Sequence, residues 1–331
     1  MPASYKDVIS PELAAKYTYT EDGKYSKELN IPTYEWMPKD SKPRAIILGI
    51  HGLTLHGRRF RVLARSLAVN GIGFIALDMR GFGASHFEPN GTLRPKEDER
   101  TKVDNEKSYE EIVQLTELIK KDYPDIKLIA LGESLGCTFC LKLAADHPDL
   151  VSGVILSAPA VRVNKSMYAG KGQIREGIKA ALSVHHEIDL ESFFAELCSN
   201  REPVKREMLD DPFVLKKLSI RSLLATDIFV DKTSKFAKPA SEDLQVLILQ
   251  GGRDGCVSPT HVTDLMKALS SDHQTLAWHG NFGHLQLETI FMRAETLDAL
   301  SGWMMLHNND NRQKMKQLQE SIASLGGDVV E

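Results

Sequence analysis

Short apolar runs alternate with longer segments of helical periodicity from about residue 44 onward, and this alternation limits the possible folds more than any other feature. Consecutive apolar positions are typical of strands buried on both faces of a parallel sheet. Such runs are Ala45–Ile50, Ile72–Leu77, Leu128–Leu131, Val154–Leu156 and Val246–Leu249. Apolar spacings of three and four predict connecting helices within Phe60–Ala68, Ile112–Ile119 and Cys140–Ala145. The sequence therefore predicts an α/β fold, with a mainly parallel sheet flanked by helices.

The same patterns extend the predicted sheet at both ends of the chain. Upstream, the partial alternation of Lys27–Trp36 predicts an antiparallel edge strand, which mixed sheets often carry. Downstream of Val246–Leu249 we expect three further elements. They are a helix at His261–Leu269, a strand at Thr275–Trp278 and a helix at Glu288–Met305.

The alternation stops between about Ser157 and Leu244, a stretch too long for a structureless loop in a compact domain. Three groups of apolar residues within it share helical spacing: Ile174, Ile178, Ala181 and Leu182; Leu190, Phe193, Phe194 and Leu197; and Val214, Leu215, Leu218 and Leu223. Asp211-Pro212 predicts the start of the last of these helices, with Asp as the cap and Pro at the first helical position. We therefore expect residues 1–160 and 241–331 to form the core, with a tail from about 307, and residues 161–240 to form a helical cap.

Composition narrows the kind of protein. Lys and Arg number 41 against 45 Asp and Glu, for a net charge of −4, so no basic field is available to hold nucleic acid. Asp7 lies where a secretory signal needs an apolar core, and no apolar run is long enough to span a bilayer. Four cysteines in a chain of 331 residues form no disulfide framework. These features predict a cytoplasmic protein.

The joint between the predicted strand Leu128–Leu131 and the helix that follows reads Gly132-Glu133-Ser134-Leu135-Gly136. Gly-x-Ser-x-Gly between a strand and a helix is the nucleophile elbow, whose sharp turn exposes the serine hydroxyl. Its glycines leave room for the neighbouring strand and helix. We therefore predict that Ser134 is a nucleophile, although a serine that only caps the helix is the alternative.

A serine nucleophile needs a base and an acid that orients the base, and in this fold the chain order is Ser, acid, His. Asp254 follows the predicted strand Val246–Leu249 and two glycines, which makes it the favoured acid. Asp264 and Asp272 are rivals, but the first falls in a predicted helix and the second just after one. Both fit exposed surface charges better.

Two histidines follow the predicted strand Thr275–Trp278. His284 lies in a loop behind Gly283, free to reach the serine, and is the favoured base. His279 lies at the strand end, where a structural histidine is the better interpretation. The predicted triad is Ser134, Asp254 and His284.

Hydrolysis also needs hydrogen-bond donors for the developing oxyanion. We expect one from the backbone N–H of Leu135, the residue after the nucleophile, and one from Leu53 in the loop after Ala45–Ile50. In the same loop His51 is interpreted as a support, and Arg58 and Arg59 as a solvated helix start.

Three other sequence patterns were compared with cofactor and metal sites, and none of them predicts such a site. Gly71-Ile72-Gly73 precedes a strand, whereas a dinucleotide fingerprint must follow one. Cys137 and Cys140 have dithiol spacing but lie in the helix after the elbow, where packing is the better interpretation. The histidines lack partners at metal spacing. Cys256, two residues after Asp254, is either buried filler or a thiol near the pocket.

Roughly residues 25–305 resemble the monoacylglycerol lipase and lysophospholipase branch of the α/β-hydrolases, also called the serine aminopeptidase-like family. The resemblance rests on His51-Gly52 with His56 and Arg59-Phe60, on the segment Asp78–Ser85, on the elbow, on the Asp254 and His284 loops, and on Asp211-Pro212-Phe213-Val214. It implies a helical cap over the site and cleavage of acylglycerols or similar monoesters. The chain departs from the family pattern at Leu285, where an acidic residue is frequent, and in the tail beyond about His307.

The predicted function is a serine ester hydrolase that cleaves lipophilic monoesters, such as monoacylglycerols or lysophospholipids, through an acyl-enzyme. An aminopeptidase, thioesterase or polar-ester esterase would share the triad, and a ligand-binding protein could keep the fold without turnover. The expected partner is a small acyl ester, with neither nucleic acid nor a stable membrane span. Met315, Leu318, Ile322 and Leu325 form a narrow apolar seam in the tail, which would dock on the protein itself or form a homodimer.

Overall fold

The computed structural model describes residues 10–161 and 186–306. The chain divides into a large unit, Met1–Met292, and a small unit, Arg293–Glu331, of which helix α13 (Ala294–Leu306) is described. The residues Ile174, Ile178, Ala181 and Leu182 of the predicted cap, and the predicted seam in the tail, lie outside the described residues.

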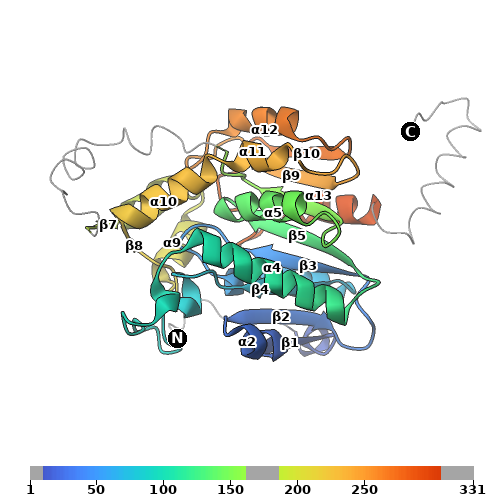
Figure 1. The fold of residues 1–331 in the computed structure, drawn as a ribbon, viewed down its shortest axis with the longest axis horizontal. Coiled ribbons are helices and arrows are strands. Elements are labelled where there is room, and N and C mark those ends of the chain that lie inside the picture. The colour runs from blue at the N-terminus through green and yellow to red at the C-terminus, as the bar shows by residue number, and fades with distance from the viewer. Residues whose placement is uncertain (1–9, 162–185, 307–331) are drawn as a thin grey trace, which may run out of the picture. The chain divides into compact units, whose positions relative to one another are not determined.

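The large unit is built on an eight-stranded sheet with the order β1-β2-β4-β3-β5-β6-β9-β10 (Figure 1). Its strands are β1 (Tyr17–Glu21), β2 (Thr33–Pro38), β3 (Ala45–Ile50), β4 (Gly73–Leu77), β5 (Lys127–Glu133), β6 (Gly153–Ser157), β9 (Gln245–Gly251) and β10 (Gln274–His279). From β4 to β10 all neighbours are parallel, whereas β2 is antiparallel to both β1 and β4. The predicted mainly parallel α/β sheet is confirmed.

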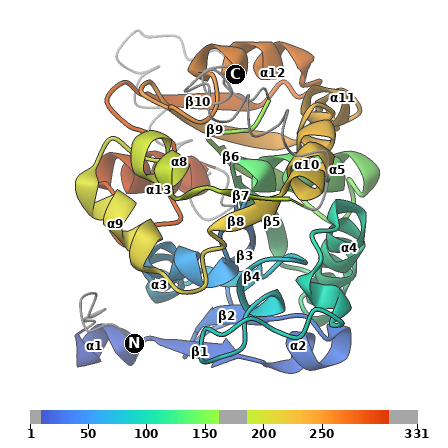
Figure 2. The ribbon, with the colours of Figure 1, turned by 90° about the vertical axis from the view of Figure 1, so that its left-hand side faces the viewer.

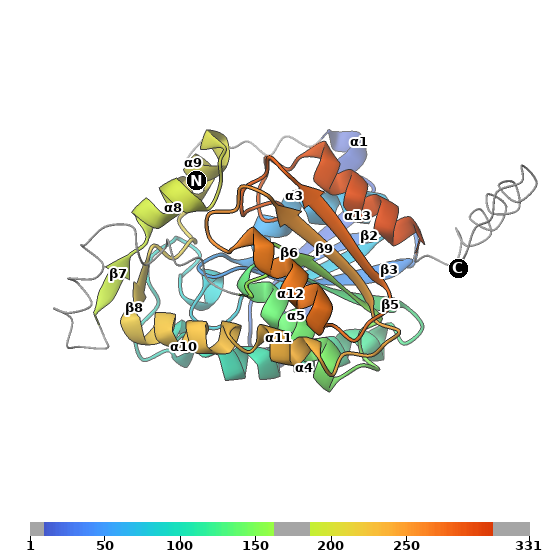
Figure 3. The same cartoon turned by 90° about the horizontal axis from the view of Figure 1, so that it is seen from above.

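The central strands β3, β4, β5, β6 and β9 are almost completely buried, which explains why their apolar runs are continuous and not alternating. Helix α3 (Arg61–Val69) covers one face of the sheet (Figure 3). The other face carries α4 (Asn105–Asp122), α5 (Leu135–Asp146), α11 (Thr233–Ala237) and α12 (Val262–Ala268). The core fills the space between these layers.

Two predictions at the ends of the fold were wrong in part. The antiparallel strand predicted within Lys27–Trp36 is present as β2, but residues 24–29 form helix α2 (Lys24–Leu29), and β1 lies outside β2 as the edge strand. The predicted helix at Glu288–Met305 begins only at Ala294, because the backbone N–H groups of residues 286–288 and 290 bond to the buried carboxylates of Glu133 and Glu207 instead of to a helical turn. A short helix, α1 (Pro11–Ala14), precedes the sheet.

The segment between β6 and β9 adds helices at the carboxyl ends of the strands, the side that faces the viewer in Figure 2. Its described elements are α8 (Glu191–Leu197), α9 (Glu202–Asp210), α10 (Ile220–Val230), α11 and a two-stranded sheet of β7 (Glu187–Asp189) and β8 (Lys217–Ser219). In residues 186–240 the insertion is therefore helical with one small antiparallel pair. Among the described residues, no helix combines the length and hydropathy needed to cross a membrane.

The helix predicted to start at Asp211-Pro212 was wrong. Asp211 follows the end of α9, and its Oδ1 accepts a hydrogen bond from the backbone N–H of Phe213, which forms a turn. Its Oδ2 bonds to Arg59 and to His56, both in the core. These long-range bonds hold the segment as a turn that leads into β8.

Candidate active site

Ser134 stands at the turn between β5 and α5, in a backbone conformation that few non-glycine residues adopt (φ 55°, ψ −114°). A Cβ on Gly132 would lie 2.3 Å from the backbone of Gly136, and a Cβ on Gly136 would lie 2.0 Å from the carbonyl oxygen of Ile50. Both glycines are therefore required by close backbone approach. Leu135 is the first residue of α5, so its N–H belongs to the helix N-terminal donors that have no partner within the helix.

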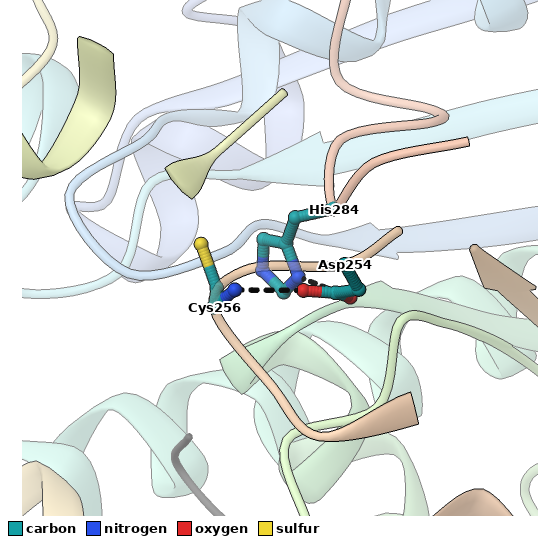
Figure 4. Close-up of side chains that lie close together, drawn as sticks. All are labelled: Asp254, Cys256 and His284. Atoms are coloured by element: carbon teal, nitrogen blue, oxygen red, sulfur yellow. Dashed lines mark hydrogen bonds and ion pairs between the residues drawn. The ribbon is translucent and has the colours of Figure 1, made fainter. Parts of the chain in front are cut away.

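Asp254 and His284 are joined by a hydrogen bond of 2.8 Å between Oδ2 and Nδ1, and both residues are buried (Figure 4). The other oxygen of Asp254 accepts the backbone N–H groups of Cys256 and Val257, at 2.9 and 3.0 Å. These bonds fix the carboxylate and direct one oxygen at the imidazole. Ser134, Asp254 and His284 follow three parallel strands, and the carboxyl ends of parallel strands meet at the same edge of the sheet.

Two opposing effects set the pKa of His284. Burial favours the neutral ring and lowers the pKa, but the charge of Asp254 and its hydrogen bond favour the imidazolium. The net result is a pKa raised from 6.5 to about 9. The pair therefore stabilises the imidazolium that a general base becomes after it accepts a proton.

The rival residues occupy different environments. Asp264 lies exposed on α12, and Asp272 is exposed before β10. His279 Nδ1 lies 2.9 Å from Oε1 of Gln286, which is the contact of a structural histidine. In the described part of the chain, Asp254 and His284 bond to each other and not to any of these three residues.

Cys256 lies close to the ring of His284 (Figure 4), and its sulfur lies 3.7 Å from the sulfur of Cys198, which follows the end of α8. It packs in an apolar cluster and is 5% exposed, and burial raises its pKa well above the usual value. Ligand-type atoms of Asp254, Cys256 and His284 lie within 4.8 Å of one another. Because Asp254 and His284 bond to each other and the thiol is protonated, this group does not fit a metal ion.

The loop after β3 approaches the same edge of the sheet. His51 is fully buried, with Nδ1 2.7 Å from the carbonyl oxygen of Gly52 and Nε2 accepting the N–H of Met79 at 3.0 Å. Burial lowers the pKa of His51 to about 4, so the ring is neutral. Leu53 is half-buried, and the next residue, Thr54, has a positive φ of 69°. His51 thus supports the loop that carries the predicted donor.

The interpretation of Arg59 as a solvated residue was wrong, because its side chain is fully buried. Nη1 lies 3.0 Å from Asp211 Oδ2, Nη2 lies 3.5 Å from Glu207 Oε2, and Nε donates to the carbonyl oxygen of Glu288 at 3.0 Å. Arg58 lies partly buried against Tyr34 and Phe213 and pairs with Glu21. Arg59 therefore fastens α9 of the insertion to the core.

Cys137 and Cys140, in the helix after the elbow, are free thiols that are fully buried in the core. Cys137 Sγ donates to the carbonyl oxygens of Gly132 and Ser157 at 3.2 and 3.3 Å. Burial raises the pKa of both thiols, which disfavours redox chemistry.

This fold, with a strained serine at a strand-to-helix turn and a buried Asp-His pair in the loops after two further parallel strands, defines an α/β-hydrolase. Residues 41–288 match the family model described as "Serine aminopeptidase, S33", so the chain belongs to that family. The protein is a serine hydrolase.

Monoglyceride lipases are similar to this chain over different shares of its length. A monoglyceride lipase homolog of Monkeypox virus is 25% identical over 277 residues, which cover 81% of this chain and 92% of that protein. The monoglyceride lipase of Mus musculus is 32% identical over 130 residues, 39% of each chain. A soluble variant of the monoglyceride lipase of Saccharomyces cerevisiae, solved with a substrate analog, superposes with a TM-score of 0.69 at 19% identity. That match covers 94% of this chain and 99% of the yeast chain.

Proposed function

We propose that this hydrolase cleaves lipophilic monoesters, such as monoacylglycerols or lysophospholipids, with Ser134 as nucleophile, His284 as base and Asp254 as the acid. The buried Asp254–His284 hydrogen bond is the observation that carries the proposal. It fixes the proton of the imidazole on Nδ1 and leaves Nε2 to accept the proton of Ser134.

In the first half-reaction His284 takes the hydroxyl proton while Ser134 Oγ attacks the ester carbonyl carbon. The negative oxygen that forms is held by the backbone N–H groups of Leu53 and Leu135. Collapse breaks the bond to the alcohol, which leaves with the proton from His284. Water then attacks the acyl-enzyme by the same route, which releases the fatty acid and restores Ser134.

The insertion 161–240 is proposed as the cap that selects the substrate. Its buried residues Phe194 and Val214 pack in one apolar cluster with Leu55 after the oxyanion loop, Cys256 after the acid and Leu285 after the base. Leu190 and Phe193 at the margin of this cluster are half-exposed. An apolar cover of this kind binds an acyl chain, with each buried methylene contributing up to about 0.8 kcal/mol.

The insertion offers little to an aminopeptidase substrate, whose ammonium group needs a fixed anion. Glu187, Glu191 and Glu196 are exposed, and Glu176 lies outside the described residues. In the described part of the insertion, the buried Glu207 and the partly buried Asp211 are already paired with Arg59. These facts favour a neutral lipophilic ester.

Initial rates across acyl esters, thioesters and aminoacyl amides test the proposed substrate class. We expect kcat/KM to rise from acetyl to medium-chain esters and monoacylglycerols to be cleaved faster than aminoacyl amides. Fastest cleavage of acetyl esters, or of aminoacyl amides, would contradict a cap that holds an acyl chain.

A further inference from the structure

Glu133, the residue between Gly132 and the nucleophile, ends β5 with a side chain that is fully buried. Its Oε1 accepts hydrogen bonds from Ser157 Oγ at 2.7 Å and from the N–H groups of Gln286 and Leu287 at 2.8 and 3.1 Å. Its Oε2 accepts the N–H groups of Glu288 at 2.8 Å and Leu287 at 3.3 Å. Every one of these partners is a donor and favours the carboxylate form, whereas burial opposes it and raises the pKa of Glu133.

These backbone donors begin two residues after His284. The carboxylate of Glu133 therefore binds the backbone that follows the proposed base. Glu133 itself directly precedes Ser134, so it links this backbone to the elbow. Asp254 sets the orientation of the imidazole ring, but it does not set the position of this part of the backbone relative to the elbow. Glu133 supplies that second constraint.

The bonding continues to the oxyanion loop through Glu288, which is also fully buried. Its own N–H donates to Glu133, and its Oε2 accepts the N–H of Gly52 at 2.9 Å. Gly52 directly precedes Leu53, whose N–H is the proposed oxyanion donor. Burial and the neighbouring charge of Glu133 raise the pKa of Glu288 well above its usual value.

We propose that Glu133 and Glu288 are positioning residues that lock the elbow, the histidine loop and the oxyanion loop into one reactive geometry. The proposal rests on the function given above for Ser134, His284 and Leu53. Neither glutamate touches the substrate; both act through the backbone of the loops.

Glu133→Gln tests the first link. The amide replaces one acceptor oxygen with a donor that faces the N–H groups of the histidine loop. Displacement of a catalytic group by about 1 Å costs on the order of a hundredfold, so we expect that loss in kcat with KM within about threefold. The rate of Ser134 labelling by a fluorophosphonate should fall with kcat.

The pH profile separates positioning from stability alone. His284 faces Asp254, Glu133 and the thiols of Cys198 and Cys256, and among these Glu133 adds negative charge that favours the imidazolium. Glu133→Gln should therefore move the acid limb of kcat/KM to lower pH. Unchanged kcat, or an acid limb that stays in place in a folded variant, would overturn the role of Glu133.

Glu111→Gln is the matched control, because Glu111 is another buried glutamate, bonded to Arg80 at 2.7 Å and bound to none of the three loops. It should lower the melting temperature while kcat stays within about threefold of the parent. An equal loss of kcat in the control would assign the effect to general destabilisation and overturn the proposal.

Glu288 gives a second test that holds even when Glu133→Gln does not fold. Glu288→Gln keeps an acceptor oxygen for the Gly52 N–H and should retain kcat within about threefold, whereas Glu288→Leu removes the acceptor and should lose at least about tenfold. Equal activities of the two variants would overturn the role of Glu288 as a positioning residue. Parent enzyme that is not labelled at Ser134 would instead refute the proposed function and leave these contacts structural.

Discussion

Asp254→Asn changes one atom at the centre of the proposed site. The oxygen that accepts the N–H groups of Cys256 and Val257 is retained, so the loop and the fold should be preserved. The new amide group faces His284 Nδ1 at the 2.8 Å contact and donates to it, which moves the ring proton to Nε2. An imidazole protonated on Nε2 cannot accept the proton of Ser134, so we expect kcat to fall on the order of 10⁴-fold.

The same change has a defined effect on pH dependence. In the parent the acid limb of kcat/KM should lie above 6.5 and toward 9, because activity needs the neutral ring and Asp254 favours the charged ring. Without that charge, burial dominates and the pKa of His284 falls, so the residual activity of the variant should persist to lower pH.

Initial rates of hydrolysis of a medium-chain ester, measured between about pH 5 and 10, give both the loss of kcat and the position of the acid limb. Asp264→Asn and Asp272→Asn are matched controls on exposed aspartates and should retain parental kcat. A loss of less than about tenfold in Asp254→Asn, or a larger loss in either control, would show that the acid is another residue.

Three further predictions follow from the loops and the insertion. Leu53→Ala should be tolerated, whereas Leu53→Pro deletes the backbone donor and should lower kcat on the order of a hundredfold; equal small effects would remove Leu53 from the site. Arg59→Met leaves Glu207 and Asp211 without their buried cation and should lower the free energy of unfolding by about 3–5 kcal/mol in urea titrations. Arg58→Met breaks a partly exposed pair and should cost about 1 kcal/mol or less, and a cost equal to that of Arg59→Met would contradict this account. The Asp254–His284 pair should stabilise the fold most below about pH 6.5 and lose that contribution as pH rises toward 9, so a melting temperature with no such fall would argue against a raised pKa of His284.

The sheet could be predicted from the sequence because strands buried on both faces leave continuous apolar runs, as in Ala45–Ile50, which matches β3. The elbow could be predicted because its requirements are local: two glycines and a serine between a strand and a helix. The Asp254 and His284 loops were found by their order after strands, a rule that needs no knowledge of contacts.

What could not be predicted depends on partners distant in sequence. Arg59 and Asp211 are 152 residues apart, and nothing near either residue indicates that both are buried together. The Asp-Pro pair therefore predicted a helix start where an ion pair between Asp211 and the buried Arg59 holds a turn. Glu133 gave one usable indication, a charged residue at the end of an apolar strand, but the backbone N–H groups that it binds lie 153 to 155 residues further along the chain.

The most direct test of the central claim is the identity of the nucleophile. Treatment with a fluorophosphonate, followed by peptide mass analysis, should place one adduct on Ser134, and Ser134→Ala should fold, resist labelling and lose several orders of magnitude in kcat. Label on another residue, or Ser134→Ala activity within about tenfold of the parent, would contradict the account.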